Sequence, residues 1–509
     1  MTLDDIVRRN GLRFPDKPAL SCDSAGYSWA ELDRRVTRLG NAFLDAGLRC
    51  GDRVAVLLGN CSEYFEIYFA CARSGLIAVP VNFRLTGPEL AQIIDHAGPS
   101  LLITDAEYAG QARIIRNLPQ RRWCISAEPV EGFQDYRSIM DAADATPVSA
   151  ESNDTFAIFY TSGTTGLPKG ALVSHRNLEM NGYNQAIADR SVPGDSNLLA
   201  TPIYHMGAVF MALTYMMLGC TQHILRKFDP GAWLGLLEQS RASVALLVPT
   251  MINAVVNAPE LQKYDLSSLR LVFYGGGPMP VSVLERAIDR LGCGFTQGYG
   301  LTETLEATFL VSADHVINGT ETQTRRLASA GREAVGAEVR IVDDAGVELP
   351  GGETGEILVK SESVIAGYWN NPEETANAIK DGWFHTGDLG YLDDERYLFV
   401  VDRKKDMVVS GGVNIYSKEI ESVLHRHPAV LEAAVIGLPD EAWGEVVTAV
   451  ISTRPGRAVT GQALIDFCRT SLAGYKKPRK VFFMDELPKN PSGKILKRVL
   501  RDNLANVVK

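Results

Sequence analysis

The chain has 509 residues, which at about 100–200 residues per domain corresponds to about three or four structural units. Its 51 lysines and arginines against 61 aspartates and glutamates give a formal net charge of −10, which argues against a protein that binds nucleic acid along its surface. With 46% hydrophobic and 22% charged residues, the composition also excludes a disordered chain.

The cysteines and the N-terminal residues indicate in which cellular compartment the protein works. None of the eight cysteines forms a C-x-x-C pair, so we expect reduced, mostly buried thiols and no zinc or thioredoxin-like site. The first ten residues, MTLDDIVRRN, carry acids at positions 4 and 5 and lack the basic-then-apolar pattern of a secretion signal. We therefore expect a cytoplasmic protein.

The first third of the chain alternates apolar strands with helices. Strands are predicted at 53–58, 77–81 and 101–104, with helices between and after them at 63–74 and 88–97. Apolar strands separated by helices indicate a parallel sheet that is covered on both faces.

The middle of the chain repeats this rhythm and then changes. Strands at 244–248 and 269–274 and a helix at 280–291 predict a second doubly wound unit. The uncharged run 206–222 is too short to span a membrane and is interpreted as a buried helix. From about residue 330 the period shortens to strands and turns, which predicts a small antiparallel β unit.

A densely charged segment, DRKKD at 402–406, is interpreted as a linker. After it the sequence predicts a helix at 417–425, strands at 431–437 and 446–452, and a helix at 461–472. These elements form a compact α+β unit of about 100 residues by their length and pattern.

The strongest local signal is the segment YTSGTTGLPKG at 160–170, which follows an apolar strand predicted at 156–160. Glycines let a backbone turn close to an anion, hydroxyl and N–H groups donate to phosphate oxygens, and Lys169 supplies positive charge. It is not a Walker A loop, because Pro168 precedes the lysine and Gly170 follows it. The segment predicts a loop that binds phosphate groups.

The same segment resembles the signature of the adenylate-forming superfamily, which comprises acyl- and aryl-CoA synthetases, luciferases and peptide-synthetase adenylation domains. Six further segments resemble that family's other motifs in the same order: ATPIYH at 200–205, YGGGP at 274–278, QGYGLTE at 297–303, WFHTGD at 383–388, DRKKD at 402–406 with SGG at 410–412, and PKNPSGK at 488–494. The resemblance covers nearly the whole chain and is strongest to bacterial fatty-acid and aryl-acid CoA ligases.

This resemblance implies an α/β fold with two parts. A large N-terminal body would contain two doubly wound α/β subdomains and a small β-barrel, and a small α+β C-terminal domain would be mobile. The implied limits are 1–401 for the N-terminal domain with its ATP and acyl pockets, 402–406 for the hinge with Lys405 at its centre, and 407–509 for the C-terminal domain.

The implied enzyme is an AMP-forming acid–thiol ligase that uses ATP, Mg²⁺ and coenzyme A. A carboxylate attacks the α-phosphate of ATP, pyrophosphate leaves, and CoA takes the acyl group from the acyl-adenylate with release of AMP. Because negative charge gathers in the transition state, cations and oriented donors do most of the catalysis. The residues that the resemblance assigns to catalysis are Thr302, Glu303, His205 and Lys494.

Each assigned residue type suits its implied role. Glu303 would hold Mg²⁺ through a hard oxygen, and Thr302 would donate to the α-phosphate. Asp388 would accept from the ribose hydroxyls, helped by Arg403, and Lys494 would bridge the reacting carboxylate and the α-phosphate. The full set implied to bind ATP is Thr161, Ser162, Gly163, Thr164, Thr165, Lys169, Gly277, Pro278, Gln297, Gly298, Tyr299, Thr302, Asp388, Arg403 and Lys494.

The acid substrate is implied to bind near residues 204–217, YHMGAVFMALTYMM. This segment is rich in methionine and aromatic residues and has no charge, which favours an apolar monocarboxylate over a dicarboxylate. Fatty and aryl acids both fit. His205 would form a wall between the acyl pocket and the thiol tunnel, where peptide-synthetase domains carry an aspartate that pairs with an amino acid. The implied substrate-binding residues are Tyr204, His205, Met206, Gly276 and Gly300.

CoA is implied to bind after the C-terminal domain turns about the hinge. The residues assigned to CoA are Lys227, Ser410, Gly411 and Gly412. The basic tail at 475–509 also matches the phosphates of CoA in sign.

Alternatives to CoA ligation are a ligase that loads a carrier protein, a luciferase-like oxygenase and a non-enzymatic nucleotide-binding protein. Expected partners are the carboxylic acid, ATP and CoA, without nucleic acid and without a transmembrane segment. The pattern around Lys494 resembles a site of bacterial lysine acetylation, which adds a protein acetyltransferase and a deacetylase as partners, and a homodimer is compatible with the resemblance.

Overall fold

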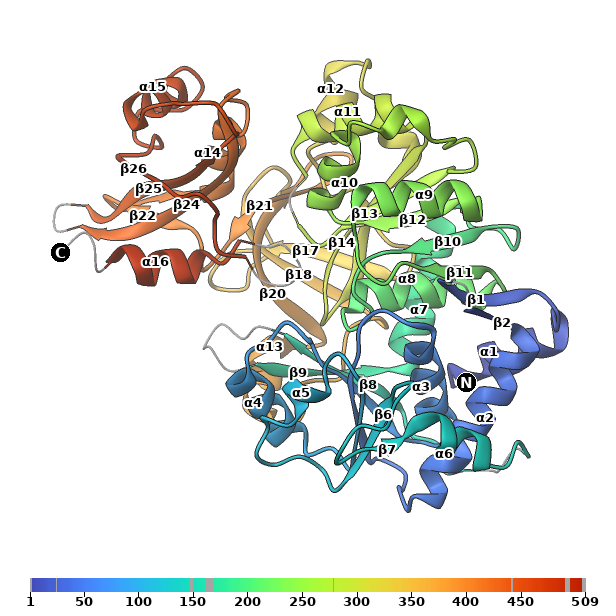
Figure 1. Ribbon diagram of the computed structural model, residues 1–509. Helices are drawn as coiled ribbons and strands as arrows, with labels where there is room; N and C mark the ends of the chain where they lie inside the picture. Colours follow the sequence, from blue (N-terminus) through green and yellow to red (C-terminus); the bar gives the residue numbers. More distant parts are fainter. Residues whose placement is uncertain are drawn as a thin grey trace.

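A computed structural model describes residues 2–23, 25–146, 150–161, 168–277, 279–440, 443–489 and 495–505. This part of the chain folds into four β-sheets and the helices that cover them. The C-terminal unit, red in Figure 1, stands apart from a larger body that contains the other three sheets. The α/β class and the division into a large body and a small C-terminal unit are therefore confirmed.

The first sheet has seven strands in the order β7-β6-β5-β3-β4-β8-β9, and all neighbours are parallel except β8 and β9. This confirms the first predicted doubly wound unit. Its strands are β3 (Arg53–Leu57), β4 (Ile77–Pro80), β5 (Leu101–Asp105), β6 (Arg121–Ile125), β7 (Gln134–Asp135), β8 (Thr155–Thr161) and β9 (Lys169–Ser174). The helices of this part are α2 (Trp29–Asp45), α3 (Ser62–Arg73), α4 (Gly87–Ala97), α5 (Ala109–Ala112) and α6 (Tyr136–Ala142).

The second sheet has nine strands in the order β16-β15-β14-β13-β12-β10-β11-β1-β2. Its strands are β1 (Pro18–Cys22), β2 (Ala25–Ser28), β10 (Ser196–Leu199), β11 (Thr221–Ile224), β12 (Val244–Leu247), β13 (Leu271–Gly275), β14 (Gly294–Leu301), β15 (Leu305–Leu310) and β16 (Arg332–Glu333). The strand β1 runs parallel to β11, with Leu20 opposite Gln222, so the start of the chain completes the second sheet. The prediction of two successive units did not include this crossing.

The helices around the second sheet are α1 (Asp4–Arg13), α7 (His175–Ala188), α8 (Met206–Met217), α9 (Pro230–Ser240), α10 (Pro249–Val256), α11 (Val281–Leu291) and α12 (Glu321–Arg326). The buried helix predicted at 206–222 is α8, but it ends five residues early. Gly219 has a φ of +77°, a left-handed conformation that glycine adopts without strain, and the chain then enters β11. The polar Gln222 is fully buried there and accepts a hydrogen bond from Asn197 on the neighbouring strand β10.

Helix ends in the body follow local sequence signals. Helix α2 begins with a capping box, in which the Glu31 N–H donates to the Ser28 hydroxyl and the Ser28 N–H donates to the Glu31 carboxylate. Helix α4 has a proline in its first turn and ends at Gly98, whose φ is +57°. The bounds of α3 and α4 predicted from the hydrophobic pattern were accurate to one residue.

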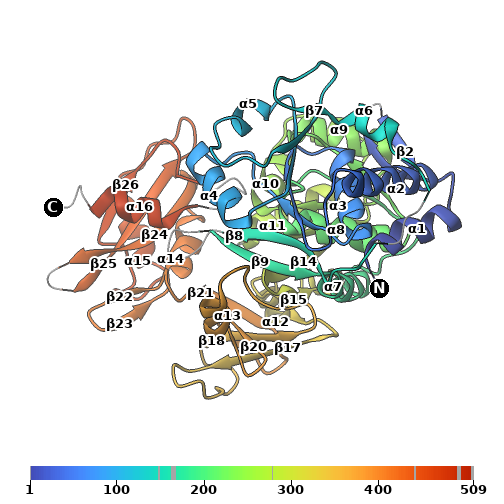
Figure 2. The same ribbon diagram turned by 90° about the horizontal axis from the view of Figure 1, so that it is seen from below.

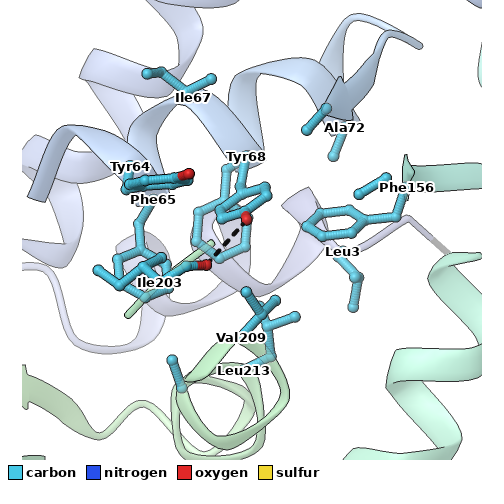
Figure 3. Close-up of a cluster of buried hydrophobic side chains, with 14 of the residues drawn as sticks. Leu3, Tyr64, Phe65, Ile67, Tyr68, Ala72, Phe156, Ile203, Val209 and Leu213 are labelled. Atoms are coloured by element: carbon cyan, nitrogen blue, oxygen red, sulfur yellow. Dashed lines mark hydrogen bonds between the residues drawn. The ribbon is translucent and has the colours of Figure 1, made fainter. Parts of the chain in front are cut away.

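The two sheets share a core formed by α3 and α8. Tyr68 of α3 donates a hydrogen bond to the Ile203 carbonyl at 3.2 Å, just before α8. Val209 and Leu213 of α8 lie below the ring of Tyr68, as Figure 3 shows. This buried contact fixes the start of α8, and with it His205, relative to the first sheet.

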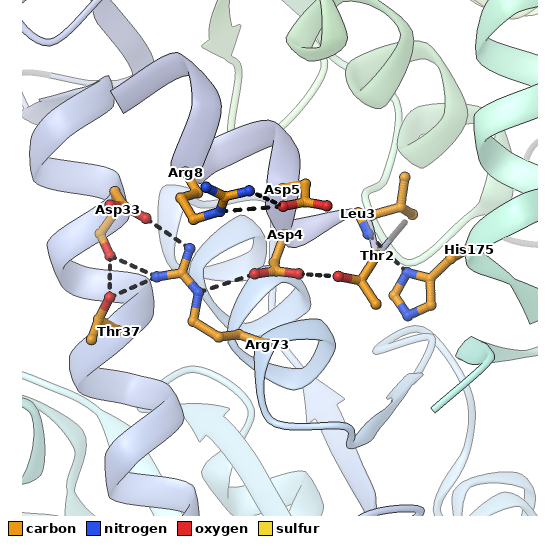
Figure 4. Close-up of polar contacts among 9 residues, drawn as sticks. All are labelled: Thr2, Leu3, Asp4, Asp5, Arg8, Asp33, Thr37, Arg73 and His175. Carbon is orange, nitrogen blue, oxygen red and sulfur yellow. Dashed lines mark hydrogen bonds and ion pairs between the residues drawn. The ribbon is translucent and has the colours of Figure 1, made fainter. Parts of the chain in front are cut away.

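A polar network ties the N-terminal helix to this core (Figure 4). Arg73 pairs with Asp33 at 2.7 Å and with Asp4 at 3.2 Å, and it also donates to the Thr37 hydroxyl. The Leu3 N–H donates to Nδ1 of His175, the first residue of α7. The network explains how a short N-terminal helix stays attached between α2, α3 and α7.

The third sheet confirms the predicted antiparallel β unit. Its strands are β17 (Ala337–Val342), β18 (Gly355–Ser361), β19 (Ile379–Lys380), β20 (Trp383–Leu392) and β21 (Leu398–Arg403), with α13 (Pro372–Ala378) before β19. In Figure 2 this sheet lies below the body and beside the C-terminal unit. The segment 402–406, predicted as a linker, begins inside β21, because Asp402 is buried and accepts from the Ser417 hydroxyl at 2.7 Å.

The C-terminal unit contains the fourth sheet, in which β25 pairs with β22, β24 and β26. Its elements are β22 (Val408–Ser410), β23 (Val413–Ile415), α14 (Ser417–Leu424), β24 (Val430–Asp440), β25 (Gly444–Thr453), α15 (Gly461–Arg469), β26 (Lys480–Phe483) and α16 (Lys497–Ala505). This agrees with the α+β unit that the sequence predicts. Within the described ranges, none of the helices is long and apolar enough to cross a membrane.

Candidate active site

Glu303 lies in the turn of the β14–β15 hairpin, where it meets the end of β8. Its Oε1 atom accepts a hydrogen bond from the Tyr368 hydroxyl at 3.0 Å and a longer one from the Thr161 hydroxyl at 3.4 Å. Its backbone carbonyl accepts from the Ile365 N–H at 2.9 Å. The predicted loop residues Ser162, Gly163, Thr164 and Thr165 lie outside the described residues. The structure thus brings the carboxylate predicted to hold Mg²⁺ to the strand that leads into the predicted phosphate loop.

Lys169 lies at the other end of that loop, on β9. Its ammonium forms an ion pair with Glu374 of α13, and it also lies 5.4 Å from the centre of the Tyr368 ring. The segment with Tyr368 lies alongside β9, since the Trp369 N–H donates to the Gly170 carbonyl at 2.7 Å. Tyr368 therefore contacts both Lys169 and Glu303. Neither Tyr368 nor Glu374 was identified from the sequence, because no local pattern links residues 368–374 to the loop.

Asp388 forms a second polar centre on β20. It is 5% exposed, accepts from the Tyr299 hydroxyl at 3.0 Å, and pairs with Arg403 of β21 at 3.2 Å. The register of β20 and β21 places Asp388 directly opposite Arg403. Lys418 of α14 approaches from the C-terminal unit; burial lowers its pKa, and nearby Asp388 and Asp402 oppose this shift. The three predicted residues Tyr299, Asp388 and Arg403 are thus brought together.

The glycines of β14 and those just after β13 differ in the space around them. A Cβ atom on Gly300 would lie 1.6 Å from the Leu305 carbonyl, so only glycine fits this hairpin. A Cβ atom on Gly298 would lie 2.4 Å from Glu306 Oε2. By contrast, Cβ atoms on Gly276 and Gly277 would meet no described atom within 4 Å. Pro278 lies outside the described residues, while Gln297 and Thr302 lie on β14 and in its turn.

His205 begins α8 and faces a group of aromatic rings. Its ring centre lies 4.5 Å from that of Tyr204, which meets Phe83 edge to face at 5.2 Å, and Phe83 stacks on Tyr108 at 4.7 Å. Burial, with a smaller effect of Arg84, lowers the pKa of His205 to about 4, so the imidazole is neutral at physiological pH. Within the described part of the chain, neither His205 Nε2 nor the Tyr204 hydroxyl has a hydrogen-bond partner.

Glu306 is a carboxyl group that the sequence analysis did not identify. It lies on β15 opposite Gly300 and is 7% exposed. Burial, and to a lesser extent Asp189, raises its pKa to about 8. An ionisable group thus lies on this face of β15, outside the uncharged segment 204–217. A glutamate inside the apolar run LEATFL was the available signal.

The residues predicted to bind CoA lie in two places. Gly411 and Gly412 form the turn between β22 and β23, with φ values of +60° and +78°. Gly411 contacts the partly exposed ring of Trp443, and the Arg479 guanidinium lies 4.0 Å from the centre of that ring. Ser410 is buried beside this turn, whereas Lys227 is exposed in the body between β11 and α9.

The predicted hinge, 402–406, begins in the last residues of β21 and continues after it. Lys405 is exposed, and its backbone carbonyl accepts a long hydrogen bond of 3.4 Å from Arg501 of α16, which also pairs with Asp406 at 2.8 Å. The predicted catalytic Lys494 lies outside the described residues.

Within the described ranges, no three or more His, Cys, Asp or Glu side chains gather into a group able to hold a metal ion.

Comparison with known proteins agrees with this geometry. The model of the AMP-binding enzyme family matches residues 7–369, and the model of the AMP-binding enzyme C-terminal domain matches residues 419–494. The chain belongs to the AMP-binding enzyme family. It is an adenylate-forming enzyme of the acid–thiol ligase type, as the resemblance implied.

Individual relatives span almost the whole chain. A feruloyl-CoA synthase of Amycolatopsis sp is 40% identical over 97% of both chains. A fatty acid–[acyl-carrier-protein] ligase of Streptomyces coeruleorubidus is 36% identical over 96% of this chain and 93% of the relative. The solved structure of ATP-bound MatB from Rhodopseudomonas palustris has a TM-score of 0.89, is 32% identical and covers 100% of both chains.

Proposed function

We propose that this AMP-binding enzyme joins an aromatic monocarboxylic acid to coenzyme A. The observation that carries the proposal is the aromatic group formed by Phe83, Tyr108, Tyr204 and the neutral His205 at the start of α8. Aromatic side chains pack favourably against the face or edge of a planar aromatic acid. The 40% identity to a feruloyl-CoA synthase supports an aryl rather than a fatty acid.

The reaction proceeds in two steps, adenylate formation and thioester formation. A carboxylate oxygen attacks the α-phosphorus of ATP, the bond to the β-phosphate oxygen breaks, and pyrophosphate leaves with the electron pair. The thiolate of CoA then attacks the acyl carbon, and AMP leaves as the thioester forms. Both steps move negative charge onto phosphate oxygens, so positioned cations and donors are the expected catalytic groups.

The chain's own residues fit these needs. Asp388 would accept hydrogen bonds from the ribose hydroxyls, because Tyr299 and Arg403 hold its carboxylate in place. Lys169 would exchange its ion pair with Glu374 for phosphate oxygens of ATP. We assign Lys494 to the approach of the acid carboxylate to the α-phosphate. His205, neutral at physiological pH, would separate the acid from the thiol without adding a charge.

The donor set around Glu303 fits Mg²⁺. This ion prefers hard oxygen ligands and commonly binds one or two carboxylates together with substrate phosphates. Glu303 supplies such a carboxylate, and the Thr161 hydroxyl lies beside it at the end of the strand that leads to the phosphate loop. When bound, the ion would neutralise charge on the phosphates of ATP.

The proposal is tested with the purified full chain, ATP, Mg²⁺ and CoA against a panel of benzoates, cinnamates and fatty acids. AMP release and thioester mass are measured for each acid. We expect aromatic acids to give AMP and aryl-CoA in equal amounts at higher kcat/KM than fatty acids. Higher kcat/KM for fatty acids would overturn the aryl assignment, and AMP release without thioester would overturn CoA ligation.

A carrier protein is the alternative acceptor, favoured by the 36% identity to a fatty acid–[acyl-carrier-protein] ligase. The same assay with phosphopantetheinylated acyl carrier protein in place of CoA distinguishes the two acceptors. We expect CoA to be used at a higher kcat/KM than the carrier protein, and the reverse order would favour the alternative.

A further inference from the structure

Glu306 extends the proposed acid site beyond the residues that the family motifs cover. It lies three residues after Glu303, the carboxylate predicted to hold Mg²⁺. The Cα atoms of the two residues are therefore at most about 10 Å apart. Its side chain lies against Gly298 and the ring of Phe273, since a Cβ atom on Gly298 would meet both within 2.5 Å. Glu306 therefore occupies, together with Phe273, the space on the face of β14 and β15 where Gly298 has no side chain.

A chain of ring contacts links this carboxyl group to the start of α8. Phe273 meets Phe210 of α8 edge to face at 5.9 Å. Phe210 lies 4.0 Å from the Cβ position of Gly207, one turn earlier in α8, close to His205. Phe210 and Phe273 thus connect, by apolar contacts, the aromatic group around His205 with the carboxyl of Glu306.

The carboxyl group of Glu306 is incompletely hydrogen-bonded. Its Oε2 atom is buried and has no hydrogen-bond partner among the described residues. Within the same described part, the nearby amide Nδ2 of Asn181 also lacks a partner, although Asn181 Oδ1 accepts from the Glu306 N–H at 2.9 Å. Buried polar atoms without partners are rare in folded proteins, and at a binding site they indicate a group that arrives with a ligand.

The neighbours of Glu306 favour an uncharged ligand group. The other carboxyl group that influences it is Asp189, whose own pKa is raised to about 6 by burial. With its own pKa near 8, Glu306 is mostly protonated at neutral pH and offers both a donor and an acceptor. A hydroxyl or an amine on an aromatic ring matches this pair, whereas a second carboxylate would meet an acidic, poorly solvated site.

We propose that Glu306 selects aromatic acids that carry a hydroxyl or amino group on the ring, remote from the reacting carboxylate, by forming a hydrogen bond with that group. This inference rests on the proposed aryl-CoA ligase function and names its substrate class. The competing explanation is an internal water that bridges Glu306 and Asn181, in which case Glu306 would not contact the acid.

The test compares matched pairs of acids on three proteins. The pairs are para-hydroxycinnamate with cinnamate and para-hydroxybenzoate with benzoate, and the proteins are the wild type, Glu306→Gln and Glu306→Leu. The measured quantity is the ratio of kcat/KM between the members of a pair, from AMP release in the presence of CoA. The exposed Glu353→Leu serves as a control for a lost carboxylate.

We expect the wild type and the control to prefer the hydroxylated acids by at least about tenfold, since a site built to hydrogen-bond a hydroxyl discriminates against the analogue that lacks it. Glu306→Gln should retain part of this preference, and Glu306→Leu should abolish or reverse it. Equal losses for both members of each pair would assign Glu306 a structural role and overturn the inference.

Failure of the inference and failure of the proposed function give different results. If the wild type uses aromatic acids but does not distinguish the pairs, the inference alone is overturned. If the wild type uses only fatty acids, both are overturned. Where Glu306→Leu does not fold, the ratio in Glu306→Gln decides, because this nearly isosteric variant lowers the preference only if Glu306 contacts the ring substituent.

Discussion

At the scale of single residues, Glu303 is the carboxylate proposed to bind the metal ion of the ATP site. Two hydroxyl groups, from Tyr368 and Thr161, converge on one of its oxygens. This arrangement holds the carboxylate beside the end of β8, and among the contacts of the described residues no cation of the chain pairs with it. The expected compensation comes from the metal that accompanies ATP.

Glu303→Gln should therefore abolish adenylate formation and leave the fold intact. Losing the charge that binds the metal should lower the rate of ATP–pyrophosphate exchange by at least about 100-fold. The melting temperature should change little, because the amide keeps the hydrogen bonds of the carboxylate oxygen. Glu353→Gln, at an exposed carboxylate outside the predicted site, is the matched control, and exchange at the parental rate in Glu303→Gln would refute the assignment.

Glu306 makes a separate prediction about pH. Its pKa rises from 4.5 in the unfolded chain to about 8 in the folded protein, so between these values the folded state binds more protons than the unfolded state. Stability from this group is thus present below about pH 4.5 and is lost as the pH rises to about 8. Glu306→Gln removes this dependence.

The measurement is the melting temperature of Glu306→Gln minus that of the wild type, taken at several pH values. The difference should increase from about pH 5 to pH 8 and then level off. A difference that does not vary with pH would show that the carboxyl group titrates normally in the folded protein.

At the scale of elements, the β14–β15 hairpin carries Tyr299, Glu303 and Glu306 into different parts of the site. Tyr299 contacts Asp388, Glu303 lies at the turn, and Glu306 lies on the face that packs against Phe273. Successive side chains of a strand point to opposite faces of the sheet, which separates the directions of these three side chains. The close approach of Gly300 to the Leu305 carbonyl fixes the conformation of the turn.

Gly300→Ala should damage both the fold and the activity. The new methyl group would lie 1.6 Å from the Leu305 carbonyl, so the hairpin would have to shift. We expect a loss of about 3 kcal/mol in the free energy of unfolding and a strong loss of pyrophosphate exchange. Gly110→Ala, where a Cβ atom meets nothing within 4 Å, is the control, and equal stability of the two variants would contradict the tight turn.

The turn at Gly411 and Gly412 makes a prediction about the second step. Trp443 and Arg479 lie beside this turn and expose an aromatic face with a guanidinium, which suits a purine and its phosphates. Trp443→Ala should raise the KM for CoA about tenfold and leave pyrophosphate exchange unchanged, while Trp443→Phe should be milder. An unchanged KM for CoA would remove this surface from the proposed CoA site.

The sequence predicted individual elements better than the contacts between distant segments. Hydrophobic patterns predicted α3, α4 and the strands β3, β4, β5, β8, β12, β13, β24 and β25. Motifs singled out Glu303, Asp388 and Arg403, which the structure places in polar contacts. The pairing of β1 with β11 depends on long-range packing that no local pattern reports. Tyr368 and Glu374 were missed for the same reason, because they act on Lys169 from a segment about 200 residues away.

At the scale of the whole molecule, the body and the C-terminal unit meet near the proposed hinge. Arg501 of α16 contacts Lys405 and Asp406, and Asp402 accepts from Ser417 of α14. The C-terminal unit contains residues proposed for both reaction steps. Lys494 is proposed for adenylate formation, whereas Gly411 and Trp443 are proposed for the step with CoA. A turn about residues 402–406 would bring each set to the same acyl-adenylate.

Lys405→Pro should separate the two steps. Proline fixes φ near −65° and restricts the preceding residue, so the hinge should no longer change conformation. Pyrophosphate exchange should persist while aryl-CoA formation falls by at least about tenfold. Equal loss of both activities would contradict a hinge at this position, and Lys405→Ala, which removes the same exposed side chain without fixing φ, is the control.

The central claim, two-step ligation through an acyl-adenylate, is tested most directly by a single-turnover experiment with the full chain and a hydroxylated aromatic acid. Enzyme in excess of ATP is first incubated with the acid and Mg²⁺ alone, and CoA is added afterwards. We predict about one equivalent of pyrophosphate and of enzyme-bound aryl-AMP before CoA is added, and conversion of the aryl-AMP to aryl-CoA and AMP afterwards. Release of ADP and phosphate, or thioester formation without a preceding aryl-AMP, would contradict it.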